Sequence, residues 1–376
     1  MKSKVGLVLM SGVERKSGPA VSLVQRARQA AALDSLAAAQ AAGAYDELIV
    51  ATNDRAWGAA LPHGITVDLD DPNRAFHFGD RLNGLVERYR LTHVVYLGAG
   101  SAPLVPADEW RRVAEQLLLA GRLVVTNNLH SSDWAGFAPA DALAPLTHRI
   151  SRDNSLAWVL HREANLPAVS RPADAGYRMD IDTPTDLLVL AGDPRCNVRL
   201  ANELAVQNLD TKRLDQARAV MASEGKQIIV AGRVSSATWQ ALEQGTLCWV
   251  RVFAEERGMV ASGRQARGQA RTLLGAYREL AGTTELLRLF AGWSDAVFWD
   301  NRVLLAHHGI WPPAEDRFAS DLGWCDRVQE PMLRELTEAA LAAPIPVILG
   351  GHSLVSGGLM ALVQRVHEEM EACLSC

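Results

Sequence analysis

The chain lacks long hydrophobic runs and an excess of positive charge. None of its 376 residues belongs to a run of eighteen apolar residues, so no membrane-spanning helix is predicted. The first residues lead directly into an apolar strand pattern rather than into a signal peptide, which indicates a cytoplasmic protein without membrane contact. The formal net charge of −5 offers no electrostatic attraction for nucleic acid, so none is expected as a partner.

Cysteine and lysine are also scarce. The five cysteines are scattered, and the pair Cys373-x-x-Cys376 has no second pair that could complete a zinc site, so incidental thiols are predicted. Only Lys212 and Lys226 follow Lys16, so arginine supplies nearly all positive charge.

The patterning of the chain alternates between strands and helices. With 48% hydrophobic and 22% charged residues it is typical of a globular protein, and 376 residues exceed one ordinary core. Patterning weakens between about 195 and 210, which predicts two domains, residues 1–200 and 205–376. Both have the βα alternation of an α/β fold: a Rossmann-like domain with a mostly parallel sheet flanked by helices, and a C-terminal α/β domain. The apolar helix over residues 27–42 could pack against a second copy of the chain, giving a homo-oligomer.

The segment Asp180-Ile181-Asp182-Thr183-Pro184-Thr185-Asp186 is the most informative stretch. Thr183 suits the N-cap of a helix, Pro184 the first helical position, and Asp186 the acidic position of a capping box. In extended backbone Asp180 and Asp182 point to the same side. Two such carboxylates could hold a divalent cation; alternatively, one tethers a loop and the other is solvated.

In the first half, polar loops follow apolar strands expected at residues 4–10, 47–52, 92–97, 123–126 and 168–170. Helices are predicted at about 21–43, 108–120 and 159–163. Ligands of open α/β sheets bind where parallel strands end. The candidate ligand-binding residues at these ends are Ser11, Gly12, Gly18, Gly98, Ser101, Asn127, Asn128 and Asp133. The run 127–133 could equally be a plain solvated loop.

Three segments resemble the nucleotide-diphospho-sugar transferase (GT-A-like) superfamily, in particular the MobA-like and 2-phospho-L-lactate guanylyltransferase-like nucleotidyltransferases. Residues 180–187 match its closing motif Asp-x-Asp-Thr-Pro-x-Asp-Leu. Residues 9–18 resemble its first-strand loop, and residues 97–104 its Gly-Gly-Asp-x-Pro-Leu segment. The resemblance covers about residues 4–195. It implies a nucleotidyltransferase that uses Mg²⁺, a nucleotide and a phosphorylated small molecule, with Asp180 and Asp182 as metal ligands and Lys16 beside the phosphates.

The chain departs from this family at three positions. Lys16 replaces an arginine, Val21 stands where a lysine is expected, and Gly100 or Ser101 replaces a metal-binding aspartate. Because transfer at phosphorus depends on cations around the phosphates, these losses leave two interpretations open. Either Asp180, Asp182 and Asp133 hold the metal in a rearranged site, or the domain is a pseudoenzyme that binds a nucleotide-like ligand without turnover.

The second half resembles no family that we can name. Strands are predicted at 227–230, 248–253 and 346–349, and a hairpin over 296–306. Glycine, serine, histidine and arginine after these strands predict an anion site composed of Gly232, Arg233, Ser235, Arg257, Gly351, His352 and Ser353, with Arg302 as a further member. Alternatively, Ser235 is an ordinary N-cap. His307, His308 and His352 could instead gather with Asp300 or Glu255 around a metal.

Overall fold

The described residues of the computed structural model, 3–13 and 18–374, form two compact units, each assembled from several stretches of chain. The first unit comprises Met1–Arg15, Arg28–Arg178 and Asn197–Leu200. The second comprises Lys16–Ala27, Met179–Cys196 and Ala201–Cys376. The contiguous domains 1–200 and 205–376 stay a prediction. Both units are α/β, as the alternating sequence pattern predicts.

The first unit is organised around a seven-stranded, mostly parallel sheet. Its strands are β1 (Val5–Ser11), β2 (Glu47–Thr52), β3 (Thr66–Leu69), β4 (His93–Gly98), β5 (Leu123–Thr126), β6 (Trp134–Ala138) and β7 (Ala168–Ser170). They lie in the order β3-β2-β1-β4-β6-β5-β7, and β6 alone runs antiparallel to its neighbours. The carboxyl ends of β1 to β4 therefore share one edge, where ligands of such sheets bind.

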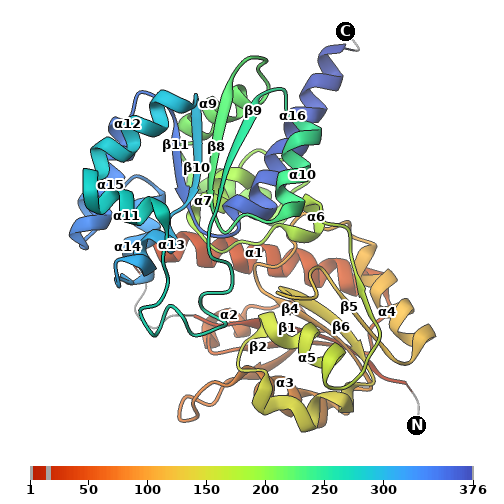
Figure 1. The fold of residues 1–376 in the computed structure, drawn as a ribbon. Helices are drawn as coiled ribbons and strands as arrows, with labels where there is room; N and C mark the ends of the chain where they lie inside the picture. Colours follow the sequence, from red (N-terminus) through yellow and green to blue (C-terminus); the bar gives the residue numbers. More distant parts are fainter. Residues whose placement is uncertain (1–2, 14–17, 375–376) are drawn as a thin grey trace. The chain divides into compact units, whose positions relative to one another are not determined.

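Helices cover both faces of this sheet (Figure 1). They are α1 (Pro19–Ala42), α2 (Arg55–Ala59), α3 (Phe78–Tyr89), α4 (Glu109–Ala120), α5 (Leu156–Arg162) and α6 (Ala175–Arg178). One core contains apolar residues of α3 and α5, and the other contains those of α4 and the second half of α1. The predicted helix over 21–43 is confirmed as α1, and Gly43 follows it in the left-handed conformation that ends helices.

The second unit contains a four-stranded sheet that is parallel throughout. Its strands are β8 (Gln227–Gly232), β9 (Trp249–Ala254), β10 (Ala296–Asp300) and β11 (Val347–Gly350), in the order β11-β10-β8-β9. The helices after the first sheet are α7 (Pro184–Leu190), α8 (Val198–Gln207), α9 (Lys212–Met221), α10 (Ser236–Gly245), α11 (Leu273–Ala281), α12 (Thr283–Trp293), α13 (Arg302–His307), α14 (Ala314–Asp321), α15 (Pro331–Ala342) and α16 (Leu359–Leu374). Residues of α11 to α15 pack on one face, whereas α9 contacts three of the strands and α10 packs on α16.

The hairpin predicted over 296–306 is wrong. β10 ends at Asp300, and the apolar residues 303–306 form the buried helix α13. β10 pairs with β8 and β11 instead of folding back on itself. A run of consecutive buried apolar residues is compatible with either a strand or a helix, and periodicity alone does not separate them.

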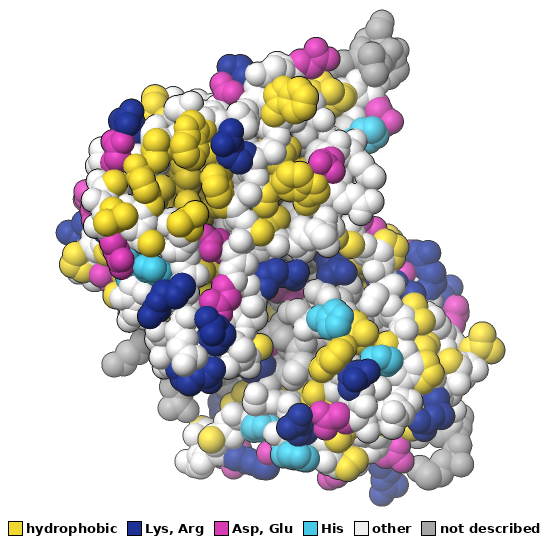
Figure 2. All heavy atoms as spheres, in the orientation of Figure 1, with side chains coloured by type: hydrophobic (Ala, Val, Ile, Leu, Met, Phe, Trp, Pro, Cys, Tyr) yellow, Lys and Arg dark blue, Asp and Glu magenta, His cyan; other side chains and the backbone are white. Residues whose placement is uncertain are grey.

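One face of the second unit carries exposed apolar side chains over α12 and the strands of the sheet (Figure 2). Among the exposed apolar residues of the second unit are Trp249 of the edge strand β9, which is 72% exposed, and Trp293 of α12, whose ring centroid lies 5.4 Å from the Arg251 guanidinium carbon. Within the described residues, no helix has the length and apolar character required to cross a membrane.

Candidate functional site

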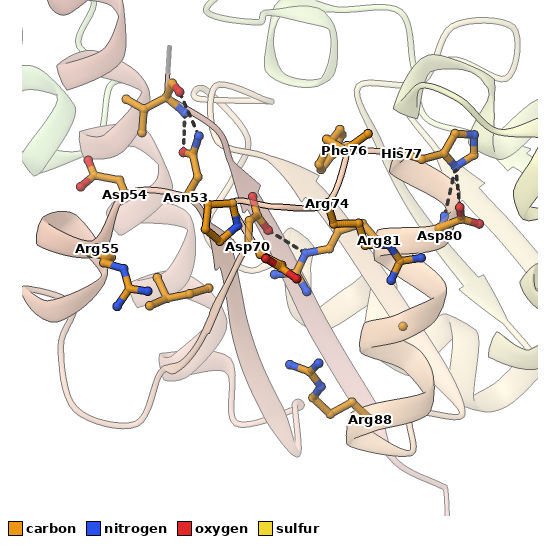
Figure 3. Close-up of a pocket in the computed structure, with 16 residues that line it drawn as sticks. Asn53, Asp54, Arg55, Asp70, Arg74, Phe76, His77, Asp80, Arg81 and Arg88 are labelled. Carbon is orange, nitrogen blue, oxygen red and sulfur yellow. Dashed lines mark hydrogen bonds and ion pairs between the residues drawn. The ribbon is translucent and has the colours of Figure 1, made fainter. Parts of the chain in front are cut away.

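A cavity of about 760 Å³ opens at the carboxyl ends of β2 and β3 in the first unit (Figure 3). The lining residues come from the first-strand loop, from the ends of both strands, from the loop before α3 and from α3 itself. They are Val13, Asn53, Asp54, Arg55, Leu69, Asp70, Asp71, Pro72, Arg74, Ala75, Phe76, His77, Asp80, Arg81, Gly84 and Arg88. Cavities of about 300–1,000 Å³ hold small-molecule ligands, so a nucleotide-sized molecule fits.

Hydrogen bonds tie the first-strand loop to this cavity. The N–H of Val13 donates to Asn53 Oδ1 at 2.8 Å, and Asn53 Nδ2 donates to the Val13 carbonyl at 3.0 Å. Asp54 caps α2 by accepting from the N–H of Trp57, and its second oxygen accepts from Gln29. The loop after β1 and the loop after β2 therefore form one hydrogen-bonded rim.

Some charged side chains at the cavity form ion pairs with each other, and others do not. Asp68, buried beneath the cavity, accepts hydrogen bonds from Arg81, Arg88 and Tyr89. Burial raises the pKa of Asp68, but these hydrogen bonds and the charge of Arg81 outweigh it and hold the pKa below its ordinary value. Arg55 and Arg74 are exposed and form no ion pair with any residue the structure describes. Their guanidinium groups can bind an anionic ligand.

The predicted residues at the ends of β1 and β4 frame the same sheet edge. Ser11 is buried and pairs with Thr52, whereas Gly12 is exposed and has open space around it. Gly98 ends β4, and a Cβ there would lie 2.8 Å from Ser101 Oγ. The Ser101 hydroxyl donates to the Asp133 carbonyl at 2.8 Å. Lys16 lies outside the described residues.

The polar run 127–133 forms a turn held by its own side chains. Asn127, only 1% exposed, donates to Asp133 Oδ2 at 2.6 Å and accepts from the Asp133 N–H at 3.1 Å. Asn128 accepts from the N–H of His130. These bonds give Asn127 and Asp133 a structural role, and nucleotide binding by Asn127, Asn128 and Asp133 stays a prediction.

The Asp-x-Asp-Thr-Pro segment belongs to the second unit. Its capping box is confirmed: Asp186 Oδ2 accepts from the N–H of Thr183 at 2.7 Å and from the N–H of Asp182 at 2.9 Å, at the start of α7. Burial and then the negative charge of Asp182 raise the pKa of Asp186 to about 7. Thr185 Oγ1 donates to the carbonyl of Leu349, which fixes α7 against β11.

The donor chemistry of Asp180 and Asp182 fits a divalent cation such as Mg²⁺. Asp182 is exposed and Asp180 is half-buried, so both carboxylates lie near solvent. Mg²⁺ prefers oxygen ligands and is commonly held by one or two carboxylates together with phosphate oxygens. Asp180 also accepts a hydrogen bond at its backbone carbonyl, from Ser353 Oγ at 2.7 Å. The motif and the glycine loop after β11 are therefore directly linked.

The anion-site residues predicted in the second half lie where β8, β10 and β11 end. Arg233 follows β8 and binds the fully buried Asp300 at the end of β10, through Nε at 2.6 Å and Nη2 at 3.1 Å. Burial raises the pKa of Asp300, but the charge and hydrogen bonds of Arg233 outweigh it and hold the pKa below its ordinary value. Burial, the charge of Arg233 and that of Arg257 lower the pKa of His352 to about 4, against the opposing charges of Asp300 and Asp182. His352 is thus neutral at pH 7.

Two further second-half residues have structural contacts. Ser235 Oγ accepts from the N–H of Thr238 at 3.1 Å, which is the ordinary N-cap of α10. Arg302 is not part of the anion cluster, because it is buried and paired with Asp321 and Asn301. Gly351 allows close packing, since a Cβ there would lie 2.8 Å from the Thr183 methyl group.

The histidines do not gather as one metal site. His307 and His308 lie beside Glu279, at 3.2 and 3.5 Å from its Oε1, whereas His352 lies in the field of Asp300. The N–H of Thr272 donates to His307 Nδ1 at 3.1 Å. That bond places the proton of neutral His307 on Nε2, where it faces Glu279 and blocks metal ligation by that nitrogen.

No protein-family model and no curated protein matches the chain. Solved structures similar to it include a cytidylyltransferase from Leptospira borgpetersenii, at 15% identity over 55% of this chain and 94% of that chain, with a TM-score of 0.38. Rv0371c from Mycobacterium tuberculosis is 19% identical over 50% of this chain and 96% of its own, with a TM-score of 0.36. A CMP:2-keto-3-deoxy-manno-octonic acid synthetase complexed with CTP is 12% identical over 49% of this chain and 95% of its own, with a TM-score of 0.33.

Proposed function

We propose that this protein transfers a nucleoside monophosphate from an NTP to a phosphorylated small molecule and releases pyrophosphate. The observation that carries the proposal is the cavity at the carboxyl edge of the first sheet, joined to the first-strand loop by the Asn53–Val13 hydrogen bonds. Its volume suits a nucleotide, and it combines hydrogen-bonding groups with the guanidinium groups of Arg55 and Arg74, which form no ion pair within the described part of the chain. An oxygen of the acceptor phosphate would attack the α-phosphorus, and the bond to the β-phosphate would break.

The cavity offers separate groups for the base and for the charged part of a nucleotide. Phe76 is 64% exposed at the cavity wall, so its ring is accessible for stacking on a base. Arg74, two residues before it, can donate to ribose or phosphate oxygens. We assign Ser11, Gly12, Gly98 and Ser101 to nucleotide contacts at the ends of β1 and β4, the sheet edge at which ligands of open α/β sheets bind.

Asp180 and Asp182 would hold Mg²⁺, which neutralises phosphate charge and polarises the phosphorus–oxygen bonds when bound. The role of these two residues in the protein is to present carboxylate oxygens at the start of α7. The capping box fixes their backbone, because Asp186 holds the N–H groups of Asp182 and Thr183. We assign Lys16 to the phosphates by its resemblance to the family's basic position.

A second candidate function is ligand binding without turnover, and one contact favours it. The N–H groups of Ala20 and Val21, in the first turn of α1, each donate at 3.0 Å to one oxygen of Glu315. Helix N-terminal N–H groups are a common seat for phosphates, and here a carboxylate of the same chain occupies it. Together with Val21 in place of a lysine, this removes stabilisation that transfer at phosphorus would use.

Calorimetric titration with each of the four NTPs, with and without Mg²⁺, tests the proposal. We expect Mg²⁺-dependent binding of one NTP that Asp182→Asn abolishes and Phe76→Ala weakens, and pyrophosphate release when an acceptor is supplied. Leu119→Ala is the matched control for Phe76→Ala, because Leu119 is an exposed apolar residue of α4. Phe253→Ala would be a poor control, because Phe253 packs against a core. Binding without pyrophosphate release across a panel of phosphorylated acceptors favours the second candidate, and absence of NTP binding refutes both.

A further inference from the structure

The second sheet has a topological switch point at the carboxyl end of β8. The strand order β11-β10-β8-β9 places the next strand, β9, on one side of β8 and the later strand β10 on the other. Connections from this point leave in opposite directions, so the loops separate and expose a crevice at the strand ends. In open parallel sheets, ligands bind at such crevices.

The strand ends approach each other closely at this switch point. Gly232, the last residue of β8, has a φ of +121°, and a Cβ there would lie 2.5 Å from the Asp300 Cβ. Asp300 orients the guanidinium of Arg233 through Nε and Nη2, so these bonds do not engage Nη1. The Arg233 side chain keeps 18% of its surface exposed although its partner has none. One edge of a preoriented guanidinium thus remains for a ligand.

His352 and Arg257 complete the cluster from the loops after β11 and β9. The Nδ1 atom of His352 is buried and has no hydrogen-bond partner in the described part of the chain. A buried nitrogen without a partner is costly, unless a ligand or water supplies one. Arg257 is exposed, forms no ion pair with a described residue, and exerts its positive charge on the His352 ring. The negative charge of Asp182 acts on the same ring and raises the pKa of His352.

We propose that this edge of the second sheet binds a phosphate group through Arg233, Arg257 and His352, beside the Asp180–Asp182 pair. Arginine presents several donors to phosphate oxygens, and a neutral imidazole can donate a further hydrogen bond. The Ser353–Asp180 hydrogen bond brings the histidine loop and the carboxylate pair together within one unit. The inference rests on the proposed function in that the phosphate belongs either to the NTP or to the phosphorylated acceptor.

Titration of the full-length chain with three probes tests the site: inorganic phosphate, glycerol 3-phosphate as a phosphate monoester, and the NTP with Mg²⁺. We expect Arg257→Gln and His352→Asn each to weaken binding of at least one probe about tenfold, which is the effect of losing one charge-assisted hydrogen bond. Arg251→Gln is the matched control, because Arg251 is also an exposed arginine of the β9 region but lies over the Trp293 ring.

The pattern of losses identifies the source of the phosphate. Weaker binding of glycerol 3-phosphate or inorganic phosphate alone assigns the site to the acceptor, and weaker NTP binding alone assigns it to the triphosphate. The inference is overturned if both variants bind every probe as the unmodified chain does, or if that chain binds none of them. One result overturns this inference and retains the proposed function: Asp182→Asn abolishes NTP binding, while Arg257→Gln and His352→Asn bind all three probes as the unmodified chain does. If phosphate binding depends on Arg257 and no NTP binds, this inference is retained and the proposed function is overturned.

Discussion

The contact between Glu315 and the start of α1 gives a prediction with a definite magnitude. α1 has 24 residues and begins after Gly18, which has no side chain to cap it. Glu315 of α14 supplies the cap, with one carboxylate oxygen on each of the Ala20 and Val21 N–H groups. Loss of an N-cap costs about 0.5–2 kcal/mol, and loss of a negative charge at a helix N-terminus costs about 0.3–1 kcal/mol. Glu315→Ala should therefore destabilise the second unit by about 2 kcal/mol.

Glu315→Gln separates the two contributions. It keeps one oxygen acceptor but loses the charge and one acceptor, so we expect a loss of about 1 kcal/mol. Gly18→Ser, which would improve most helix starts, should also destabilise the protein. A Cβ at position 18 would lie 2.2 Å from the Glu315 Cδ and would displace the carboxylate.

Thermal unfolding and amide hydrogen exchange provide the assay. A loss of about 2 kcal/mol lowers the transition temperature of a unit of this size by roughly 4–8 °C. Exchange should accelerate at the amides of Ala20 and Val21 in Glu315→Ala. Glu224→Ala is the control, because Glu224 is exposed and forms no side-chain hydrogen bond or ion pair with a described residue. If Glu315→Ala unfolds within 1 °C of the unmodified chain and exchange at these amides is unchanged, the carboxylate is not a cap and the reasoning fails.

Three further predictions concern pH, backbone conformation and the cavity. The pKa of Asp186 in the folded state is about 7 and lies above the ordinary value of 3.8 for an aspartate. The native state therefore binds more protons between these pH values, so this residue makes the free energy of unfolding fall as pH rises through that window. Asp186→Asn should remove this fall, measured as the difference between urea unfolding curves of the two proteins from pH 4.5 to 7.5; equal slopes would contradict the shift. Gly232→Ala should destabilise the protein by at least about 2 kcal/mol, because Gly232 has a positive φ and a Cβ there would contact Asp300. Gly292 lies in α12 with open space around it, so Gly292→Ala should stabilise the protein by about 0.5–1 kcal/mol in the same urea assay. Arg74→Ala should weaken NTP binding about tenfold in calorimetry without changing stability, and unchanged affinity would remove Arg74 from the binding site.

Local sequence patterns predict most of the elements but not how the strands are ordered. β1, β2, β4 and β5 follow from apolar runs, and α7 follows from the capping residues Thr183, Pro184 and Asp186. The local pattern does not predict β6, because Trp134–Ala138 is a short run that is buried at all five positions. Its antiparallel pairing with β4 and β5 depends on distant residues. The side chains of the polar run before it hold the turn between β5 and β6, and ligand binding by this run stays a prediction.

The sequence pattern does not indicate the cavity, for a related reason. β3 is a four-residue edge strand with a mixed burial pattern, so the sequence pattern predicts neither a strand at 66–69 nor a ligand-binding loop after it. Asn53 and Asp54 directly follow the predicted strand 47–52, and this polar pair was the available signal. In the second unit, single residues after strands predicted Arg233 and His352, but only the parallel register shows that they share one sheet edge.

The way the chain is divided between the two units affects how it can be dissected. A fragment that stops near residue 200 would contain α1 but not Glu315, so the first-turn N–H groups would lose their acceptor. It would also contain α7 without β11, which leaves the Thr185 hydroxyl without the Leu349 carbonyl. The complementary fragment would lack both segments. Either half expressed alone therefore lacks contacts that it has in the whole chain. Studies of one unit should keep the whole chain and inactivate the other unit by point substitution.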